Sequence, residues 1–231
     1  MPPERELVLL HALPLDAAMW EAQREILPGA TCAPTLYGLG DRVEDWAAAV
    51  LKRVTGGRLI LVCCSVGGSC ALEIAAAAPE RVEALVLIGT KASHRPDPAL
   101  HAAAIETVRE RGLESAWNEF WAPSFSRSAG EGVVDHAKRI ALRQSPVDVA
   151  RGVTAFHTRP SRDRVLSDYA GPVVVVTGAE DTAPGPKVSA AQAAQAPKGR
   201  LVVVPDCGHY VPLERPERLS AILNDVISSL P

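Results

Sequence analysis

Short apolar runs alternate with alanine-rich stretches along most of this sequence. The runs are rich in leucine and β-branched residues and cover residues 6–10, 31–36, 58–63, 84–88, 172–177 and 200–204. Each run is too short for a core helix and too continuously apolar for a strand with one face in water, which is typical of parallel strands covered on both faces. Helices are expected between them, near residues 17–27, 43–54, 66–78, 186–196 and 213–229. The alternation predicts an α/β fold with a doubly wound, mostly parallel sheet of about six strands.

The alternation stops between about residues 91 and 169. This stretch has no clear strand pattern, several helical patterns and most of the aromatic residues of the chain. We therefore predict a helical lid (cap), residues 91–169, inserted over the carboxyl edge of a core made of residues 1–90 and 170–231.

Composition narrows the class of protein. Among 231 residues, 47% are apolar and 22% charged, and the formal net charge is −3 without a basic stripe. This balance predicts a large folded core and argues against nucleic acid or an anionic membrane as the main partner. No long apolar segment suits export or membrane spanning, so a cytoplasmic location is expected. Cysteine occurs five times, three of them between residues 63 and 70, and the spacing fits no zinc pattern. Buried thiols are expected, with no metal and no cofactor.

The strongest motif surrounds Ser65. An apolar run leads into Cys64-Ser65-Val66 and directly on into a helical pattern. A serine exposed on such a strained turn needs small residues two positions before and after it, and Cys63 and Gly67 stand there. A serine that only caps the helix is the alternative. The motif favours Ser65 as a nucleophile.

Two further loops follow buried strands. Asp181 follows the run that ends at residue 177, and His209 follows the run that ends at residue 204. The order Ser, Asp, His, each beyond a different strand, predicts a catalytic triad of Ser65, Asp181 and His209. Glu180 is the nearest rival acid, while Asp206 is expected to shape the loop before His209.

The loop after the first strand is predicted to complete an oxyanion hole. We assign its donors to the backbone N–H groups of Leu13 and Val66, with His11 bracing the loop. In the predicted lid, aromatic side chains recur at roughly helical spacing and form either lid packing or an apolar wall of the substrate pocket: Trp117, Phe120, Trp121 and Phe125. Arg159 and Arg162 near its end suit either salt bridges or a substrate carboxylate.

Several segments together resemble the α/β-hydrolase family from end to end. They are HALPxDxxxW, CCSVGG, AAAAPERVEALVLIGT, GAEDTAPGP and DCGHYVPLERPERL. The resemblance is closest to bacterial carboxylesterases similar to the pimeloyl-acyl-carrier-protein methyl esterases, with the 3-oxoadipate enol-lactonases nearby. It implies the nucleophile, acid and base roles for Ser65, Asp181 and His209.

The chain departs from the family pattern in three ways. Ala12 and Cys63 stand where glycine is usual, and the first two strands of the family core are expected to be missing. The edge strand that remains would need cover, so a homodimer is considered beside a monomer.

The predicted function is hydrolysis of a small-molecule ester by a serine esterase. A lactone hydrolase, an enol-lactone hydrolase included, would use the same triad. Thioester and carbon–carbon hydrolysis stay open, as does a cysteine hydrolase acting through Cys64, although that side chain should point away from His209. A non-catalytic ligand-binding protein of the same fold is the alternative from another class.

Overall fold

The computed structural model describes residues 3–231. A single six-stranded sheet runs in the order β2-β1-β3-β4-β5-β6, and every neighbouring pair is parallel. The strands are β1 (Arg5–Leu10), β2 (Thr31–Cys32), β3 (Arg58–Cys64), β4 (Val82–Ile88), β5 (Val173–Gly178) and β6 (Gly199–Val204). The predicted six-stranded parallel α/β sheet is confirmed.

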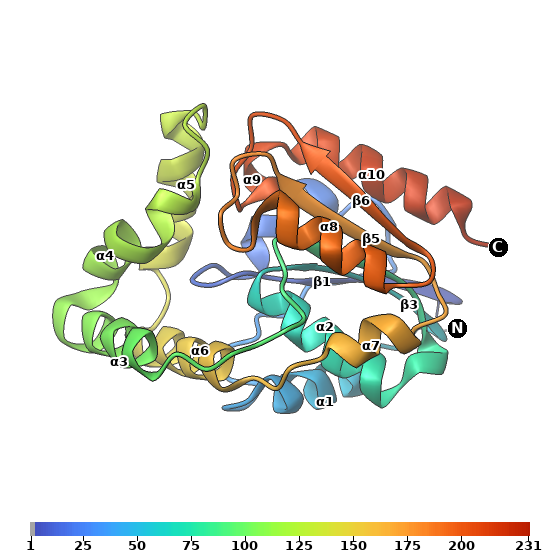
Figure 1. Cartoon of the computed structure of the whole chain (residues 1–231), viewed down its shortest axis with the longest axis horizontal. Coiled ribbons are helices and arrows are strands. Elements are labelled where there is room, and N and C mark those ends of the chain that lie inside the picture. The colour runs from blue at the N-terminus through green and yellow to red at the C-terminus, as the bar shows by residue number, and fades with distance from the viewer. Residues whose placement is uncertain (1–2) are drawn as a thin grey trace.

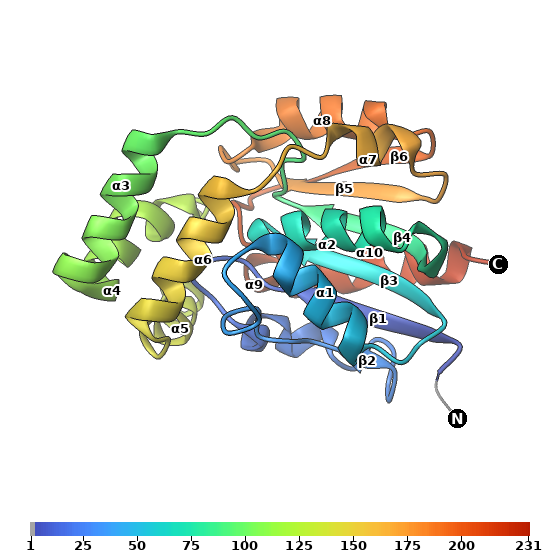
Figure 2. The ribbon, with the colours of Figure 1, turned by 90° about the horizontal axis from the view of Figure 1, so that it is seen from below.

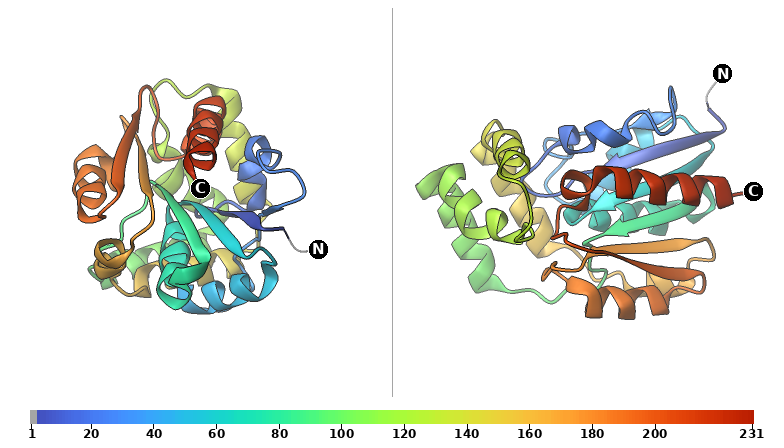
Figure 3. Two further views of the ribbon diagram at one scale, coloured as in Figure 1. Left: turned by 90° about the vertical axis from the view of Figure 1, so that its right-hand side faces the viewer. Right: turned by 90° about the horizontal axis from the view of Figure 1, so that it is seen from above.

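Helices cover both faces of the sheet. Helices α1 (Val43–Arg53), α2 (Val66–Ala77) and α8 (Gly185–Gln195) lie on one face, and Figure 2 shows α1 and α2 in front of the strands. Helices η1 (Ala17–Gln23), α9 (Val211–Glu214) and α10 (Pro216–Ser229) cover the other face, and the right-hand view of Figure 3 shows α10 (dark red) in front of the strands and running along them. Successive strand residues therefore alternate between two apolar cores, so that Cys63 lies in one and Cys64 in the other.

The second strand is much shorter than the sequence predicts. Only Thr31–Cys32 pair with β1, whereas the apolar run extends to Leu36. Pro34 has no N–H to donate to a ladder, and the Leu36 N–H donates instead to the His11 imidazole at 2.8 Å. The apolar character of Leu36 reflects burial in the core rather than strand pairing.

Two predicted helices also differ in form. The segment after β1 forms the 3₁₀ helix Ala17–Gln23 and ends before residue 27. The final helix is divided at Arg215, whose φ of −140° separates α9 from α10. Pro216 then occupies the first turn of α10, where its missing N–H costs nothing.

Between β4 and β5 the described chain forms only helices and loops. These are α3 (Pro98–Glu106), the π-helical turn η3 (Thr107–Arg111), α4 (Gly112–Ala116), the π-helical turn η4 (Trp117–Trp121), η5 (Ala122–Ser124), α5 (Glu131–Leu142), α6 (Pro146–Thr158) and α7 (Asp163–Asp168). Figure 1 shows α3 to α6 at the end of the sheet opposite both chain termini. The last helix, α7, packs against α2 and α8 of the core. Within residues 3–231, no helix has both the length and the apolarity that crossing a membrane requires.

The carboxyl ends of the strands meet at the edge of the sheet that faces α3 to α6 (Figure 2). Ser65 follows β3, while Asp181 and His209 lie in the loops after β5 and β6. The loop after β1 carries Leu13. All four loops of the predicted site are therefore on the same edge of a parallel sheet, where ligands bind in folds of this kind.

Candidate active site

Ser65 lies at a sharp turn between β3 and α2. Its φ of 53° and ψ of −118° lie outside the regions that residues with a side chain favour. The turn needs glycine two positions later, because a Cβ on Gly67 would come within 2.3 Å of the Leu10 carbonyl oxygen. Val66 starts α2 at once, so the positive end of the helix dipole lies beside the serine. Ser65 thus has the strand–turn–helix setting of an exposed nucleophile.

The neighbouring residues Cys63 and Cys64 are fully buried, each in a different apolar core. The Cys63 thiol donates to the Val86 carbonyl oxygen at 3.2 Å, and the Cys64 thiol donates to the backbone oxygen of His209 at 3.8 Å. Burial raises the pKa of the Cys64 thiol well above its usual value, which keeps the side chain protonated. A cysteine nucleophile at this turn is therefore disfavoured.

Asp181 and His209 are in direct contact. The His209 Nδ1 atom lies 3.1 Å from Asp181 Oδ2 and 3.2 Å from Oδ1. Both side chains are buried, and Asp181 Oδ1 also accepts the Ala183 N–H at 2.8 Å. Because Nδ1 faces the carboxylate, Nε2 is the ring nitrogen left to act as a base.

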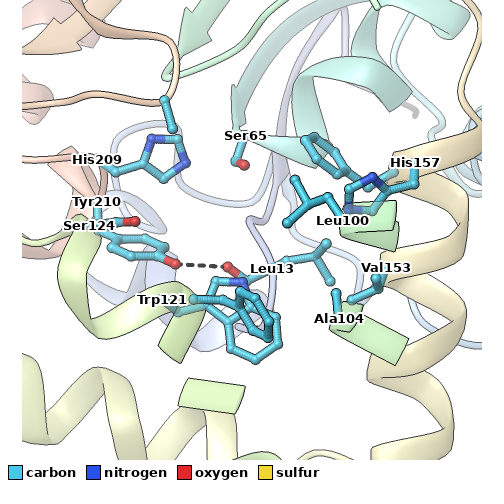
Figure 4. Close-up of a pocket in the computed structure, with 13 residues that line it drawn as sticks. Leu13, Ser65, Leu100, Ala104, Trp121, Ser124, Val153, His157, His209 and Tyr210 are labelled. Atoms are coloured by element: carbon cyan, nitrogen blue, oxygen red, sulfur yellow. Dashed lines mark hydrogen bonds between the residues drawn. The ribbon is translucent and has the colours of Figure 1, made fainter. Parts of the chain in front are cut away.

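Ser65 and His209 line one cavity of about 260 Å³. Figure 4 shows the two side chains facing each other across it. No hydrogen bond joins them within residues 3–231, whereas the contact between His209 and Asp181 is already formed. The cavity wall is otherwise mainly apolar, with side chains from the core and from the inserted helices: Leu13, Leu100, Ala104, Phe120, Trp121, Val153, Phe156 and Tyr210.

Two of the four aromatic residues predicted for the substrate pocket do not line this cavity. Phe120 and Trp121 form part of its wall. Trp117 is only 1% exposed and packs in the second apolar core, with its ring 5.9 Å from that of Phe125. Phe125 in turn packs against Tyr210, with the ring centres 4.8 Å apart. Trp117 and Phe125 thus follow the packing alternative, because their rings join the inserted segment to the core.

Most of the apolar wall was not predicted from the sequence. Leu100 and Ala104 lie one turn apart on α3, and Val153 and Phe156 are three residues apart on α6. Both spacings place two side chains on one helix face. This spacing could have indicated that each pair shares a helix face, but it does not show which face of each helix points at Ser65.

The predicted oxyanion donors have free N–H groups. Neither the Leu13 N–H nor the Val66 N–H donates a hydrogen bond in the described part of the chain. His11 braces the Leu13 loop from a fully buried position, since its Nε2 accepts the Leu36 N–H and its Nδ1 contacts the Ala12 carbonyl oxygen at 3.0 Å. Burial lowers the pKa of His11 to about 4, so the ring is neutral at pH 7.

Glu180, the rival acid, and Asp206 both hold the surrounding loops in place. Glu180 accepts the backbone N–H of Arg127 at 3.0 Å and pairs with its guanidinium at 3.3 Å. Asp206 adopts a positive φ of 50°, and its carbonyl oxygen accepts hydrogen bonds from Ser126 and Ser128. Neither carboxylate contacts the His209 ring, in contrast to Asp181.

Glu214 is a buried carboxylate that the sequence analysis did not single out. Its two oxygens lie 3.1 Å from the Gly208 nitrogen, and Oε2 accepts the Ser126 N–H at 3.0 Å. Ser124 accepts the N–H of His209 through its carbonyl oxygen at 2.8 Å. The loop that carries His209 is therefore fixed both from α9 and from the inserted segment.

Comparisons with known proteins find relatives that match nearly the whole chain. A pimeloyl-[acyl-carrier protein] methyl ester esterase from Aromatoleum aromaticum is 28% identical over 96% of this chain and 98% of its own length. A thermophilic esterase from Thermogutta terrifontis, solved with malate bound, matches with a TM-score of 0.89 and 26% identity over 99% of this chain and 91% of that one. An enol-lactonase from Burkholderia xenovorans has a TM-score of 0.87 at 19% identity, covering 99% and 92%, and this likeness concerns the fold.

These matches confirm the resemblance found in the sequence. The model of the alpha/beta hydrolase family matches residues 7–222, and the chain belongs to that family.

Proposed function

We propose that this chain is a serine esterase that cleaves a small carboxylic ester through an acyl-enzyme on Ser65. The observation that carries the proposal is the hydrogen bond between Asp181 and His209 beside the cavity that the strained Ser65 also lines. The esterase names of relatives at 28% and 26% identity support the same reaction.

The reaction proceeds in two halves. Nε2 of His209 takes the hydroxyl proton while Ser65 Oγ bonds to the ester carbonyl carbon. The carbon–alkoxy bond then breaks, and the leaving alcohol receives that proton from His209. Water attacks the acyl-enzyme in the same way, His209 again taking and returning one proton, and the carboxylic acid leaves. Asp181 holds the imidazole and stabilises its protonated form.

The oxyanion formed in each half is stabilised by the N–H groups of Leu13 and Val66. Both are free of protein acceptors within residues 3–231. A preorganised donor of this kind contributes on the order of 3 kcal/mol to stabilisation of the transition state. Since both donors are backbone groups, side-chain substitutions at these positions report on them only weakly.

We also propose that residues 91–169 act as a lid over the site. Helices α3 and α6 supply apolar wall residues, and η4 supplies Phe120 and Trp121. Such a wall suits the alkyl or acyl part of an ester and excludes water from the acyl-enzyme.

Hydrolysis of p-nitrophenyl butyrate tests the proposal. Ser65→Ala is expected to lower kcat by at least 1,000-fold, on the order expected for loss of a triad nucleophile. Cys64→Ala is the matched control, because it removes a thiol from the next residue and should leave kcat within about threefold. Activity that survives Ser65→Ala but not Cys64→Ala would contradict the proposal.

A panel of esters and lactones of graded size separates the remaining possibilities. Turnover of lactones alone, abolished by Ser65→Ala, would assign the chain as a lactone hydrolase with the same groups. A folded protein that turns over no ester, thioester or lactone, and that binds them without change, would be a ligand-binding protein.

A further inference from the structure

A second cavity meets the first at Ser65. It has a volume of about 420 Å³, and Ser65, Leu100, Phe156 and His157 line both cavities. Its other lining side chains differ sharply in charge from the apolar wall of the first. They include the cations of Lys91, Arg95 and Arg159 and a single carboxylate, that of Asp97. The space beside the proposed nucleophile is thus apolar on one side and cationic on the other.

Arg159 is a buried cation without a counter-ion among the described residues. The residue is only 7% exposed, and its guanidinium carbon lies 3.9 Å from the centre of the Phe156 ring. Nη1 donates to the Phe156 carbonyl oxygen, whereas Nε is buried and has no hydrogen-bond partner within residues 3–231. No carboxylate pairs with Arg159 in that part of the chain. A buried charge without a counter-ion is costly to maintain unless a ligand supplies one.

Arg162, three residues further along the chain, does have a counter-ion within the protein. Arg162 makes a bidentate ion pair with Glu73, at 2.7 Å and 2.8 Å. Of the two arginines that the sequence analysis considered for a substrate carboxylate, Arg162 is therefore neutralised within the protein. Asp97 forms no ion pair with Arg159 within residues 3–231, and its Oδ1 accepts the Leu100 N–H at 3.0 Å, which caps α3.

The other titratable groups of the cavity leave its positive charge in place. Burial lowers the pKa of Arg159 to about 10, so the guanidinium is still charged at neutral pH. Burial, with help from His101, Arg159 and His94, lowers the pKa of His157 to about 4, which makes that imidazole neutral. His94 is fixed by a contact of 2.9 Å between its Nε2 and the His157 carbonyl oxygen.

We infer that Arg159 binds a carboxylate of the substrate, and that the substrate is therefore an ester or lactone bearing a free carboxylate away from the scissile bond. The inference rests on the proposed function of Ser65. Nε and Nη2 form one edge of the guanidinium, and two parallel N–H groups match the two oxygens of a carboxylate. Of the three cations of this cavity only Arg159 is buried, and its single charge matches a carboxylate better than a phosphate dianion.

The two cavities then divide the substrate at its carbonyl group. An apolar alkyl group occupies the space between Phe120, Trp121 and Val153, and the carboxylate reaches Arg159 from the other side of Ser65. A monoalkyl ester of a short dicarboxylic acid has this arrangement. A neutral ester of the same length leaves Arg159 buried and unpaired.

Matched pairs of substrates test the inference. Monobutyl succinate, glutarate and adipate differ from butyl butyrate, pentanoate and hexanoate only in a terminal carboxylate in place of a methyl group. For at least one length, kcat/KM is expected to be at least tenfold higher for the acid ester, mainly through KM. A preference for the neutral ester at every length would overturn the inference.

Variants identify the residue responsible. Arg159→Gln should lower the ratio of kcat/KM for acid over neutral ester at least tenfold, and Arg159→Lys should lower it less, because the charge is kept and the fork is lost. Arg95→Gln is the control, since it removes the same charge from an exposed position in the same cavity. Its ratio should change by less than threefold. An equal loss in Arg95→Gln and Arg159→Gln would mean general electrostatic attraction and would contradict the assignment.

Binding gives a readout that does not need turnover or a folded Arg159→Gln protein. In calorimetric titrations of the wild type, glutarate should bind at least tenfold more tightly than glutaramide and than inorganic phosphate. Equal affinity for the diamide, or tighter binding of phosphate, would overturn the inference. Glutarate binding without turnover of any ester would instead reject the proposed function and leave the subsite standing. Turnover of esters with no preference for the acid esters would reject the carboxylate subsite and leave the proposed function standing.

Discussion

The phenol of Tyr210 donates a hydrogen bond of 3.0 Å to the carbonyl oxygen of Leu13 (Figure 4). Tyr210 directly follows the proposed base His209, and Leu13 carries one of the proposed oxyanion donors. Both residues are buried. One contact therefore holds the loop after β1 against the loop after β6, at the point where proton transfer and oxyanion binding have to be aligned.

Removal of that contact should affect the rate more than binding. Tyr210→Phe deletes the donor and leaves the Leu13 carbonyl oxygen unsatisfied, so kcat is expected to fall about tenfold with KM within about threefold. The expected loss of stability is about 1 kcal/mol. Tyr169→Phe is a matched control, because the Tyr169 phenol donates a 3.0 Å hydrogen bond to the Val82 carbonyl oxygen and lines neither cavity beside Ser65. A similar loss of kcat in both variants would mean that the Tyr210 contact is merely structural.

Gly89 leaves room for the imidazole. Its φ is +53°, and a Cβ there would come within 2.7 Å of His209 Cε1 and 3.2 Å of Asp181 Oδ2. Gly89→Ala should displace the ring and lower kcat for p-nitrophenyl butyrate at least 100-fold, because small misplacements of a reacting group cost about that much. Gly132→Ala, on α5 with nothing within 4 Å of the added Cβ, should leave kcat unchanged. Full activity in Gly89→Ala would contradict the assignment of His209.

Glu214 should contribute to the stability of the fold. Glu214→Gln leaves one acceptor oxygen for two buried N–H groups, those of Gly208 and Ser126. We expect a loss of about 2 kcal/mol, which corresponds to roughly 4–8 °C in Tm for a domain of this size. Thermal unfolding followed by circular dichroism measures it. Glu217→Gln on the exposed surface of α10 is the control, and an equal Tm for both variants would contradict the role of Glu214.

Acid should destabilise the fold through His11. Its pKa is about 4 in the folded chain and close to 6.5 when unfolded, so below pH 6.5 the unfolded chain binds a proton that the folded chain does not. The stability that depends on neutral His11 is complete above pH 6.5 and is lost as the pH falls towards 4. Between pH 7 and pH 5 this linkage amounts to about 2 kcal/mol. Urea unfolding at both pH values should show a decrease that is smaller by about this amount in His11→Gln, and an equal decrease in both proteins would refute it.

The strands and the positions of the triad residues could be predicted, because both depend on patterns within short stretches of the sequence. Continuous apolar runs mark strands buried on both faces, and the positions of Ser65, Asp181 and His209 just after such runs predict their common edge. The exception among the strands is the run that ends at Leu36, where Pro34 stops the ladder although the side chains remain buried. Apolar periodicity reports burial, and burial does not always mean strand pairing.

Features that depend on how the inserted segment meets the core were not predictable. The π-helical turn over Trp117–Trp121 changes the direction of successive side chains, so Trp117 turns to the core while Phe120 and Trp121 face the cavity. Glu214 lies in a charged segment that resembles a solvated helix start, and its burial depends on the distant Ser126 loop. Arg159 and Arg162 are three residues apart, and the sequence does not show that Glu73 pairs with Arg162 while Arg159 is buried against Phe156.

Reaction with a fluorophosphonate tests the central claim most directly. The probe bonds covalently to a serine hydroxyl activated by a neighbouring base, and peptide mass spectrometry of the labelled chain locates the adduct. We expect one adduct, on Ser65, lost in Ser65→Ala, strongly reduced in His209→Ala and retained in Cys64→Ala. A folded wild-type protein without an adduct at Ser65, or with the adduct on another residue, would contradict the account.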